Sequence, residues 1–319
     1  MTKQLIILLT ISNLIFSFER IFFQSANPFS LRDIIKSLPE QSPQRVFGNL
    51  TLPNLENTSK KIPLIIAVAG SRGWKEHHFE YLEMYQKMGI ATFELNSFKS
   101  RNVSSTVGTQ TEVTTAMMIL DSYKALEILS NHPNIDIDNV AITGWSLGGG
   151  VTLFSGWKPL MDAIDSEYSF AAHLAFYPPC FVMPKNLEFT ISPVHILIGE
   201  VDIWTPAAAC KELINEINHF KYDFDITVYP ESHHSFDVRD TTAQIIEEGY
   251  SFYDCRLKMN DYGTVVMNVL NIPMTTPLLQ KIGLAFCADR GPIIGGNINA
   301  RKQSFEFAKT FMNKHLIDN

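Results

Sequence analysis

The chain has 319 residues, of which 45% are hydrophobic and 18% are charged, so it encodes a globular protein with a large core rather than a disordered or fibrous one. Its formal net charge of -7 leaves no basic surplus to contact phosphate backbones, which excludes nucleic acid as an expected partner. This length fits one large α/β domain or two small ones.

The N-terminal segment has the pattern of an export signal. Lys3 precedes an apolar run over residues 5–18, which is shorter than the roughly 20 residues of a membrane-spanning helix. We therefore expect residues 1–26 to be a signal peptide, cleaved near Ser17 or near Ala26, and the mature protein to be periplasmic or secreted, with no stable membrane span. An uncleaved N-terminal membrane anchor and a buried N-terminal helix are the alternatives.

Strand and helix patterns alternate along the rest of the chain. Arg45–Leu52 alternates like an edge strand, and Ile62–Val68 is the continuous apolar run of a buried strand. Further strands are expected at Ile90–Leu95, before Gly144, and at Ala171–Tyr177, Val194–Ile198 and Phe224–Tyr229, and helices at His77–Met88, Thr114–Leu129, Pro206–Asn218 and Asn299–Ile317. Repeated strand–helix units predict an α/β domain, residues 27–319, with a mostly parallel central sheet covered by helices on both faces.

Two adjacent histidines, His77 and His78, open the first of these helices. No acidic or cysteine partner lies at the spacing of a metal site. We expect a solvated helix terminus here and no metal.

The stretch Val140–Thr152, VAITGWSLGGGVT, contains a GxSxG motif between a strand and a helix. On such a turn the serine adopts a strained backbone, and the flanking glycines remove side chains that would clash. Ser146 is therefore the candidate nucleophile. The alternative is a glycine-rich turn with a solvent-facing serine.

An acid and a histidine follow the elbow at the ends of later strands. Asp202 follows the strand Val194–Ile198, and His234 follows Phe224–Tyr229. Because sites in open α/β sheets lie at the carboxyl ends of strands, these residues can meet Ser146, and the order Ser, acid, His is that of one class of serine triad. Glu200 and Asp237 are rival acids, and His233 is a rival base.

Other residues are expected around this triad. The backbone N–H groups of Leu147 and Ser71 are candidates for an oxyanion hole, because one follows the nucleophile and the other lies in the loop after a buried strand. Arg101, Tyr177 and Trp204 are tentative substrate contacts from loops at the same edge; for Arg101, the alternative is an ion pair with a surface acid.

Four cysteines in a chain expected to be exported permit two disulfides. Pairing Cys255 with Cys287 and Cys180 with Cys210 is our expectation, because each pair brackets one local region, and four free buried thiols are the alternative. From residue 250 onward the periodicity weakens, so residues 250–319 are expected to be a C-terminal extension packed on the domain, without chemistry of its own.

Several motifs in order resemble the dienelactone hydrolase family of α/β-hydrolases: VAGSRGW, ATFELNSFKSRNV, GWSLGGG, AFYPPC, LIGEVDIWTPAAAC and VYPESHHSFD, spanning roughly residues 65–236. The resemblance implies the α/β-hydrolase fold, Ser146 as nucleophile, Asp202 as triad acid and His234 as base. The expected activity is hydrolysis of a small carboxylic ester or lactone, without a cofactor. A prolyl-peptidase-like enzyme and a non-catalytic small-molecule binding protein are the alternatives.

Overall fold

The computed structural model describes residues 17–53, 61–220, 222–267 and 271–318, and within these residues eight strands form one central sheet. The strands are β1 (Ser17–Ala26), β2 (Pro43–Leu52), β3 (Ile62–Val68), β4 (Ala91–Leu95), β5 (Ile135–Trp145), β6 (Ala172–Phe176), β8 (Val194–Gly199) and β9 (Phe224–Tyr229). Their order is β1-β2-β4-β3-β5-β6-β8-β9, and neighbouring strands run parallel from β4 to β9. The apolar runs seen in the sequence form the parallel strands, because such strands are buried on both faces.

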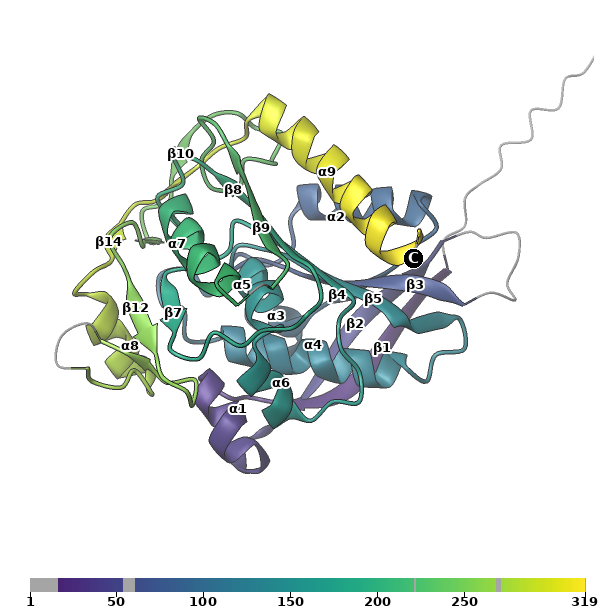
Figure 1. The fold of residues 1–319 in the computed structure, drawn as a ribbon, viewed down its shortest axis with the longest axis horizontal. Coiled ribbons are helices and arrows are strands. Elements are labelled where there is room, and N and C mark those ends of the chain that lie inside the picture. Colours follow the sequence, from purple (N-terminus) through teal and green to yellow (C-terminus); the bar gives the residue numbers. More distant parts are fainter. Residues whose placement is uncertain (1–16, 54–60, 221, 268–270, 319) are drawn as a thin grey trace, which may run out of the picture.

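Helices cover both faces of this sheet, with α2 and α9 on one side and α4 and α6 on the other (Figure 1). The helices are α1 (Leu31–Ser37), α2 (Glu76–Lys87), α3 (Ser97–Ser100), α4 (Thr115–Leu129), α5 (Leu147–Phe154), α6 (Lys158–Ile164), α7 (Ala207–Asn218), α8 (Pro277–Leu284) and α9 (Ile298–Leu316), with a 3-10 turn at Leu38–Glu40. The ring of Tyr81 on α2 stacks on Phe305 of α9 at 3.8 Å between centroids. The C-terminal helix is therefore part of the layer that buries the sheet, and the expected α/β architecture is confirmed.

Strand β1 corrects the expected boundary of the folded domain. It pairs antiparallel with β2 along its whole length, from Ser17 opposite Leu52 to Ala26 opposite Pro43, and so makes β2 an interior strand rather than an edge strand. Cleavage near Ala26 would remove a strand of the sheet, so the domain begins by Ser17 and not at residue 27. The hydropathy pattern misplaces this boundary because the apolar run over residues 5–18 continues into β1.

Residues 1–16, where the rest of the expected signal peptide or anchor falls, lie outside the described residues. No helix in the described part of the chain is both long and apolar enough to span a membrane.

Short elements between β9 and α9 form a layer over the carboxyl edge of the sheet. We call residues 244–267 and 271–294 the cap segment; besides α8 it contains β10 (Gln244–Ile245), β11 (Tyr250–Ser251), β12 (Leu257–Met259), β13 (Val265–Val266), β14 (Asp289–Arg290) and β15 (Ile293–Ile294). β12 pairs with β13 and with β7 (Val182–Pro184), which joins the cap segment to the main domain (Figure 1).

Two disulfides are present, in the pairing expected from the sequence. Cys255–Cys287 lies within the cap segment, and Cys180–Cys210 joins the loop after β6 to α7. One bond therefore stabilises the cap segment and the other stabilises the sheet edge beneath it.

Candidate active site

Ser146 lies on a sharp turn between β5 and α5, with φ 56° and ψ -116°, a strained conformation for a residue with a side chain. Close packing around the turn requires glycine on each side. A Cβ atom on Gly144 would lie 2.2 Å from the carbonyl oxygen of Gly148, and one on Gly148 would lie 2.2 Å from that of Val68. The turn therefore holds the Ser146 hydroxyl at the carboxyl edge of the sheet, beside the N-terminus of α5.

Side chains from three strand ends form a hydrogen-bonded chain at this edge. His234 Nε2 lies 2.9 Å from Ser146 Oγ, and His234 Nδ1 lies 2.7 Å from Asp202 Oδ2. The histidine in contact is His234 rather than the adjacent His233. Asp202 and His234 are 1% and 2% exposed, so the low dielectric around them strengthens their interaction.

The loop between β8 and α7 fixes the Asp202 carboxylate. Its Oδ1 accepts hydrogen bonds from the backbone N–H groups of Trp204 and Thr205, both at 2.8 Å, and its Oδ2 accepts one from the Thr205 hydroxyl at 3.0 Å. Oδ2 also faces His234 Nδ1, which therefore carries the ring proton. His234 Nε2 is left as an acceptor for the Ser146 hydroxyl.

The two rival acids occupy other positions. Glu200 is exposed, and its carboxylate accepts a hydrogen bond from the backbone N–H of Glu231, in the loop after β9. Asp237 is fully buried, but its carboxylate accepts hydrogen bonds from Trp145 Nε1 at 3.1 Å and from the Tyr177 hydroxyl at 2.9 Å. The acid that meets the histidine is therefore Asp202.

Two aromatic rings enclose His234. The ring centroid of Tyr177 lies 4.6 Å away, edge-on, and that of Trp204 lies 4.9 Å away. Burial and the charge of Asp237 raise the pKa of Tyr177 well above its usual value, so its hydroxyl remains a donor to that carboxylate. Of these two tentative substrate contacts, Trp204 lines both cavities at Ser146, whereas Tyr177 lines one of them and its hydroxyl is bound to Asp237.

Two backbone amides lie beside the serine. The N–H of Leu147 is the first of α5, a position for which the helix itself offers no acceptor. Ser71 lies in a turn closed by a 2.9 Å hydrogen bond from Gly73 N–H to the Gly70 carbonyl. This turn approaches the elbow closely, since a Cβ atom on Gly70 would lie 3.3 Å from that of Ser146. Leu147 and Ser71, the two candidate oxyanion residues, line one cavity together with Ser146.

Arg101 lines neither cavity at Ser146, so its expected contact with substrate is wrong. Its guanidinium donates two hydrogen bonds to the Asp121 carboxylate, at 2.6 and 3.1 Å, and one to the carbonyl oxygen of Ala26 at 3.0 Å. The Arg101 and Asp121 side chains are 5% and 0% exposed, so the partner is a buried acid rather than a surface one. Arg101 ties the end of β1 to α4, a long-range contact that local sequence does not reveal.

His77 and His78 are buried, which corrects the expected solvated helix terminus. The ring of His78 stacks on Trp145 at 4.5 Å, and His77 Nε2 lies 3.5 Å from the Tyr177 hydroxyl. Burial lowers the pKa of both histidines and keeps them neutral near pH 7. In the described ranges, no group of three or more potential ligand residues is placed to hold a metal ion.

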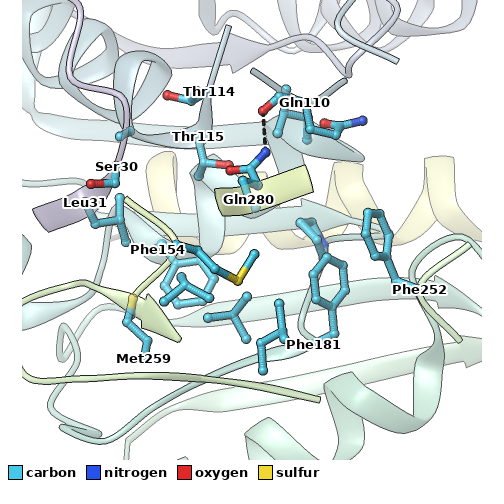
Figure 2. A pocket seen from close by; sticks show the side chains of 18 of the residues that line it. Ser30, Leu31, Gln110, Thr114, Thr115, Phe154, Phe181, Phe252, Met259 and Gln280 are labelled. Atoms are coloured by element: carbon cyan, nitrogen blue, oxygen red, sulfur yellow. Dashed lines mark hydrogen bonds between the residues drawn. The ribbon is translucent and has the colours of Figure 1, made fainter. Parts of the chain in front are cut away.

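Two cavities that differ in the charge of their lining residues meet at Ser146, and Ser71 and Trp204 also line both. The apolar chamber, of about 200 Å³, is lined by uncharged residues, among them Leu31, Phe154, Phe181, Phe252, Leu257, Met259, Val265, Met274 and Leu284 (Figure 2). The polar chamber, of about 430 Å³, is lined by His234 and by charged side chains that include Arg72, Lys75, Glu76, Glu80, Arg239 and Asp240.

The cap segment supplies much of the apolar chamber, although the sequence indicated no role for it in the site. Phe252, Leu257, Met259 and Val265 all line this cavity. A weak signal was present, because Leu257 and Met259 alternate with the exposed Lys258 and so place two apolar side chains on one face of a strand.

Comparison with known proteins agrees with this arrangement. The family model described as the dienelactone hydrolase family matches residues 82–255. None of the curated proteins matches the chain.

Among solved structures, the chain is similar to the dienelactone hydrolase-like promiscuous phosphotriesterase P91 from metagenomic libraries, with 15% identity, a TM-score of 0.56, and 93% of this chain and 98% of that one covered. It is also similar to the acylaminoacyl peptidase of Pyrococcus horikoshii, with 14% identity, a TM-score of 0.52, and 72% and 39% covered. At these identities the likeness shows a shared fold. Because the family match spans more than half of the chain, this protein belongs to the dienelactone hydrolase family of α/β-hydrolases.

Proposed function

We propose that this hydrolase cleaves carboxylic esters or lactones through an acyl-enzyme on Ser146. The observation that supports this most directly is the hydrogen-bonded chain Ser146–His234–Asp202, with Oγ to Nε2 at 2.9 Å and Nδ1 to Oδ2 at 2.7 Å. A nucleophile, a base and a residue that orients the base, at these distances, are the components of nucleophilic acyl transfer.

In the proposed mechanism, His234 Nε2 accepts the proton of Ser146 as Oγ bonds to the substrate carbonyl carbon. The carbonyl oxygen becomes an oxyanion and accepts hydrogen bonds from the amides of Leu147 and Ser71. When the bond to the leaving oxygen breaks, His234 gives that oxygen its proton and the acyl group stays on Ser146. Asp202 stabilises the transient imidazolium.

Water completes the cycle in the same geometry. His234 accepts a proton from water as the hydroxide oxygen bonds to the acyl carbon, and returns that proton to Ser146 Oγ when the acyl–enzyme bond breaks. The products are a carboxylic acid and the alcohol released in the first half. Neither half-reaction uses a cofactor.

The test is hydrolysis of p-nitrophenyl acetate combined with labelling by a fluorophosphonate probe. The wild type should turn over the ester and be labelled, and Ser146→Ala should abolish labelling and lower kcat by at least about 10³-fold. Ser232→Ala is the matched control, because Ser232 lies two residues from His234 but its hydroxyl donates a hydrogen bond to the Pro230 carbonyl.

Folded wild-type protein that is neither labelled nor active would contradict the proposal and favour the binding-protein alternative. Cleavage of proline-containing peptide amides far faster than of esters would instead favour the peptidase alternative.

We also propose that the protein is exported. The two disulfides support this, because such bonds persist in oxidising compartments. N-terminal sequencing of the protein from the extracytoplasmic fraction is the test. We expect a mature N-terminus at or before Ser17, since later cleavage would remove residues of β1, and recovery of reduced protein only in the cytoplasm would refute the proposal.

A further inference from the structure

Ser146 divides its site into two chambers, and the base lies on only one side. His234 lines the polar chamber with the charged side chains, whereas Leu147, whose amide begins α5, lines the apolar chamber. The two sides of a scissile ester bond would therefore meet different surroundings.

The position of His234 determines which side is which. In the proposed mechanism His234 protonates the leaving oxygen, so the alcohol part of the ester has to lie on the side of the polar chamber. The carbon substituent of the acyl group then points away from the imidazole, toward the apolar chamber.

We propose that the apolar chamber is an acyl pocket and that the substrates are esters of an apolar carboxylic acid of about six to eight carbons; this inference rests on the proposed serine hydrolase function. The chain of this carboxylic acid is apolar and carries no charge.

The walls of the chamber support this assignment. Phe181 and Phe252 stack at 4.2 Å between ring centroids and are 9% and 5% exposed, so they form a wall already shielded from water. Met259 and Met274, 1% and 6% exposed, add flexible side chains that adapt to an apolar ligand. Figure 2 shows Phe154, Phe181, Phe252 and Met259 grouped on one side of the cavity.

Polar side chains at the opposite rim have partners within the protein. Gln280 donates a 3.0 Å hydrogen bond to the Gln110 carbonyl, drawn in Figure 2, and the Thr114 hydroxyl donates to the Pro28 carbonyl at 3.2 Å. These groups do not require a polar acyl group, and no charged side chain among the described residues lines the chamber.

The size of the chamber sets the expected length. An apolar protein cavity of about 150 Å³ holds a ligand the size of benzene. At about 200 Å³ the chamber is somewhat larger. Each methylene that enters it should raise kcat/KM roughly fourfold, until the chamber is full.

A pair of isomeric esters tests the orientation directly. Ethyl hexanoate and hexyl acetate contain the same atoms, but the six-carbon chain is on the acyl side in the first and on the alcohol side in the second. We expect kcat/KM for ethyl hexanoate to be at least about tenfold higher. Equal values, or a preference for hexyl acetate, would overturn the assignment of the chambers.

Two neighbouring residues of β13 provide a matched pair of variants. Val265 lines the chamber, whereas Val266 does not, because successive residues of a strand point to opposite faces, and both are partly buried. Val265→Phe should fill the cavity and reduce the ratio of kcat/KM for ethyl hexanoate over hexyl acetate at least about fivefold. Val266→Phe should leave the ratio within about twofold of the wild type.

A series of p-nitrophenyl esters from acetate to palmitate on the wild type keeps the proposal testable should the valine variants fail to fold. We expect kcat/KM to rise to a maximum at six to eight acyl carbons and to fall beyond it. A flat profile, or a maximum at acetate, would refute the acyl pocket while leaving the serine hydrolase intact. No hydrolysis of any ester would refute the proposed function itself.

Discussion

The carboxyl edge of the sheet and the cap segment contribute to one site but are built in different ways. Ser146, Asp202 and His234 follow the parallel strands β5, β8 and β9, which pair over several residues in the core. The cap segment consists of strands of two or three residues, one helix and a disulfide. The difference suggests a division of roles, in which the sheet fixes the geometry of the reaction and the cap segment sets the substrate.

The two regions are also in contact beside His234. Ile294 of β15 forms a bridge with His234, and Gly295 N–H donates a 3.1 Å hydrogen bond to the His234 carbonyl. Changes in the cap segment can reach the base by this route. Variants in the two regions therefore need measurements that separate the rate of the reaction from its selectivity among substrates.

The largest effect is expected from Asp202→Asn at the sheet edge. An amide in place of the carboxylate favours the wrong tautomer of His234, so kcat should fall about 10³- to 10⁴-fold. The preference among acyl lengths should persist, because Asp202 does not line the apolar chamber. Steady-state kinetics on p-nitrophenyl acetate and hexanoate measure both quantities.

Glu200→Gln serves as the control for this variant, since Glu200 is an exposed acid beside the same strand. Its kcat should stay within about twofold of the wild type. Loss of activity in Glu200→Gln with Asp202→Asn unaffected would show that the acid of the triad has been misassigned.

Removal of the cap disulfide should alter selectivity more than chemistry. The double variant Cys255→Ser and Cys287→Ser opens a loop with a sequence separation of 32 and should lower the free energy of unfolding by about 3 kcal/mol. The looser wall should also flatten the preference for hexanoate over acetate. Guanidinium unfolding and the ratio of kcat/KM for the two esters are the measurements, and an unchanged ratio would mean that β7 and β12 hold the cap segment without the disulfide.

Acid should weaken the sheet rather than the cap segment. Burial lowers the pKa of His173, on β6, to about 4, and its Nδ1 lies 2.9 Å from the Thr152 carbonyl oxygen. The unfolded chain takes up this proton near pH 6.5 and the folded chain only near pH 4, so stability is complete above pH 6.5 and is lost progressively as the pH falls between these values. The contribution is on the order of 3 kcal/mol. No histidine occurs between residues 244 and 294, so the cap segment has no equivalent group.

Thermal unfolding between pH 7 and pH 4.5 measures this effect. His173→Gln should show a shallower loss of Tm with acid than the wild type, whatever its stability at pH 7. A parallel loss in both proteins would assign the acid sensitivity to other groups.

Most of the sheet and the contact of His234 with Ser146 and Asp202 could be predicted from the sequence, because their signals are local. Apolar runs mark the parallel strands, and Ser146, Asp202 and His234 each follow such a run by a few residues. The glycines around Ser146 identify its turn, because the close approach of the backbone there excludes a side chain.

Contacts between distant parts of the chain could not be predicted. Arg101 pairs with a buried acid 20 residues away, and the burial of His78 depends on Trp145 from another element. In the cap segment, paired strands such as β12 and β13, in which Lys258 lies opposite Val266, are too short to produce a periodic pattern. The hydrogen-bonded chain at the sheet edge is thus predictable from the sequence, whereas the lining of the apolar chamber depends on folding of the cap segment.

The smallest effect is expected from Tyr177→Phe, which tests whether this residue belongs to the support of the sheet edge or to the substrate site. Its hydroxyl donates a 2.9 Å hydrogen bond to the buried Asp237 carboxylate, so the variant should lose about 1 to 3 kcal/mol of unfolding free energy. The ring that packs on His234 is retained, so KM and kcat for ethyl hexanoate should change less than about threefold. A several-fold rise in KM with unchanged stability would instead show that the hydroxyl contacts substrate, as the sequence first suggested. Trp204→Phe is the comparison, because Trp204 lines both chambers. The main effect of the smaller side chain should be a rise in KM rather than a loss of unfolding free energy.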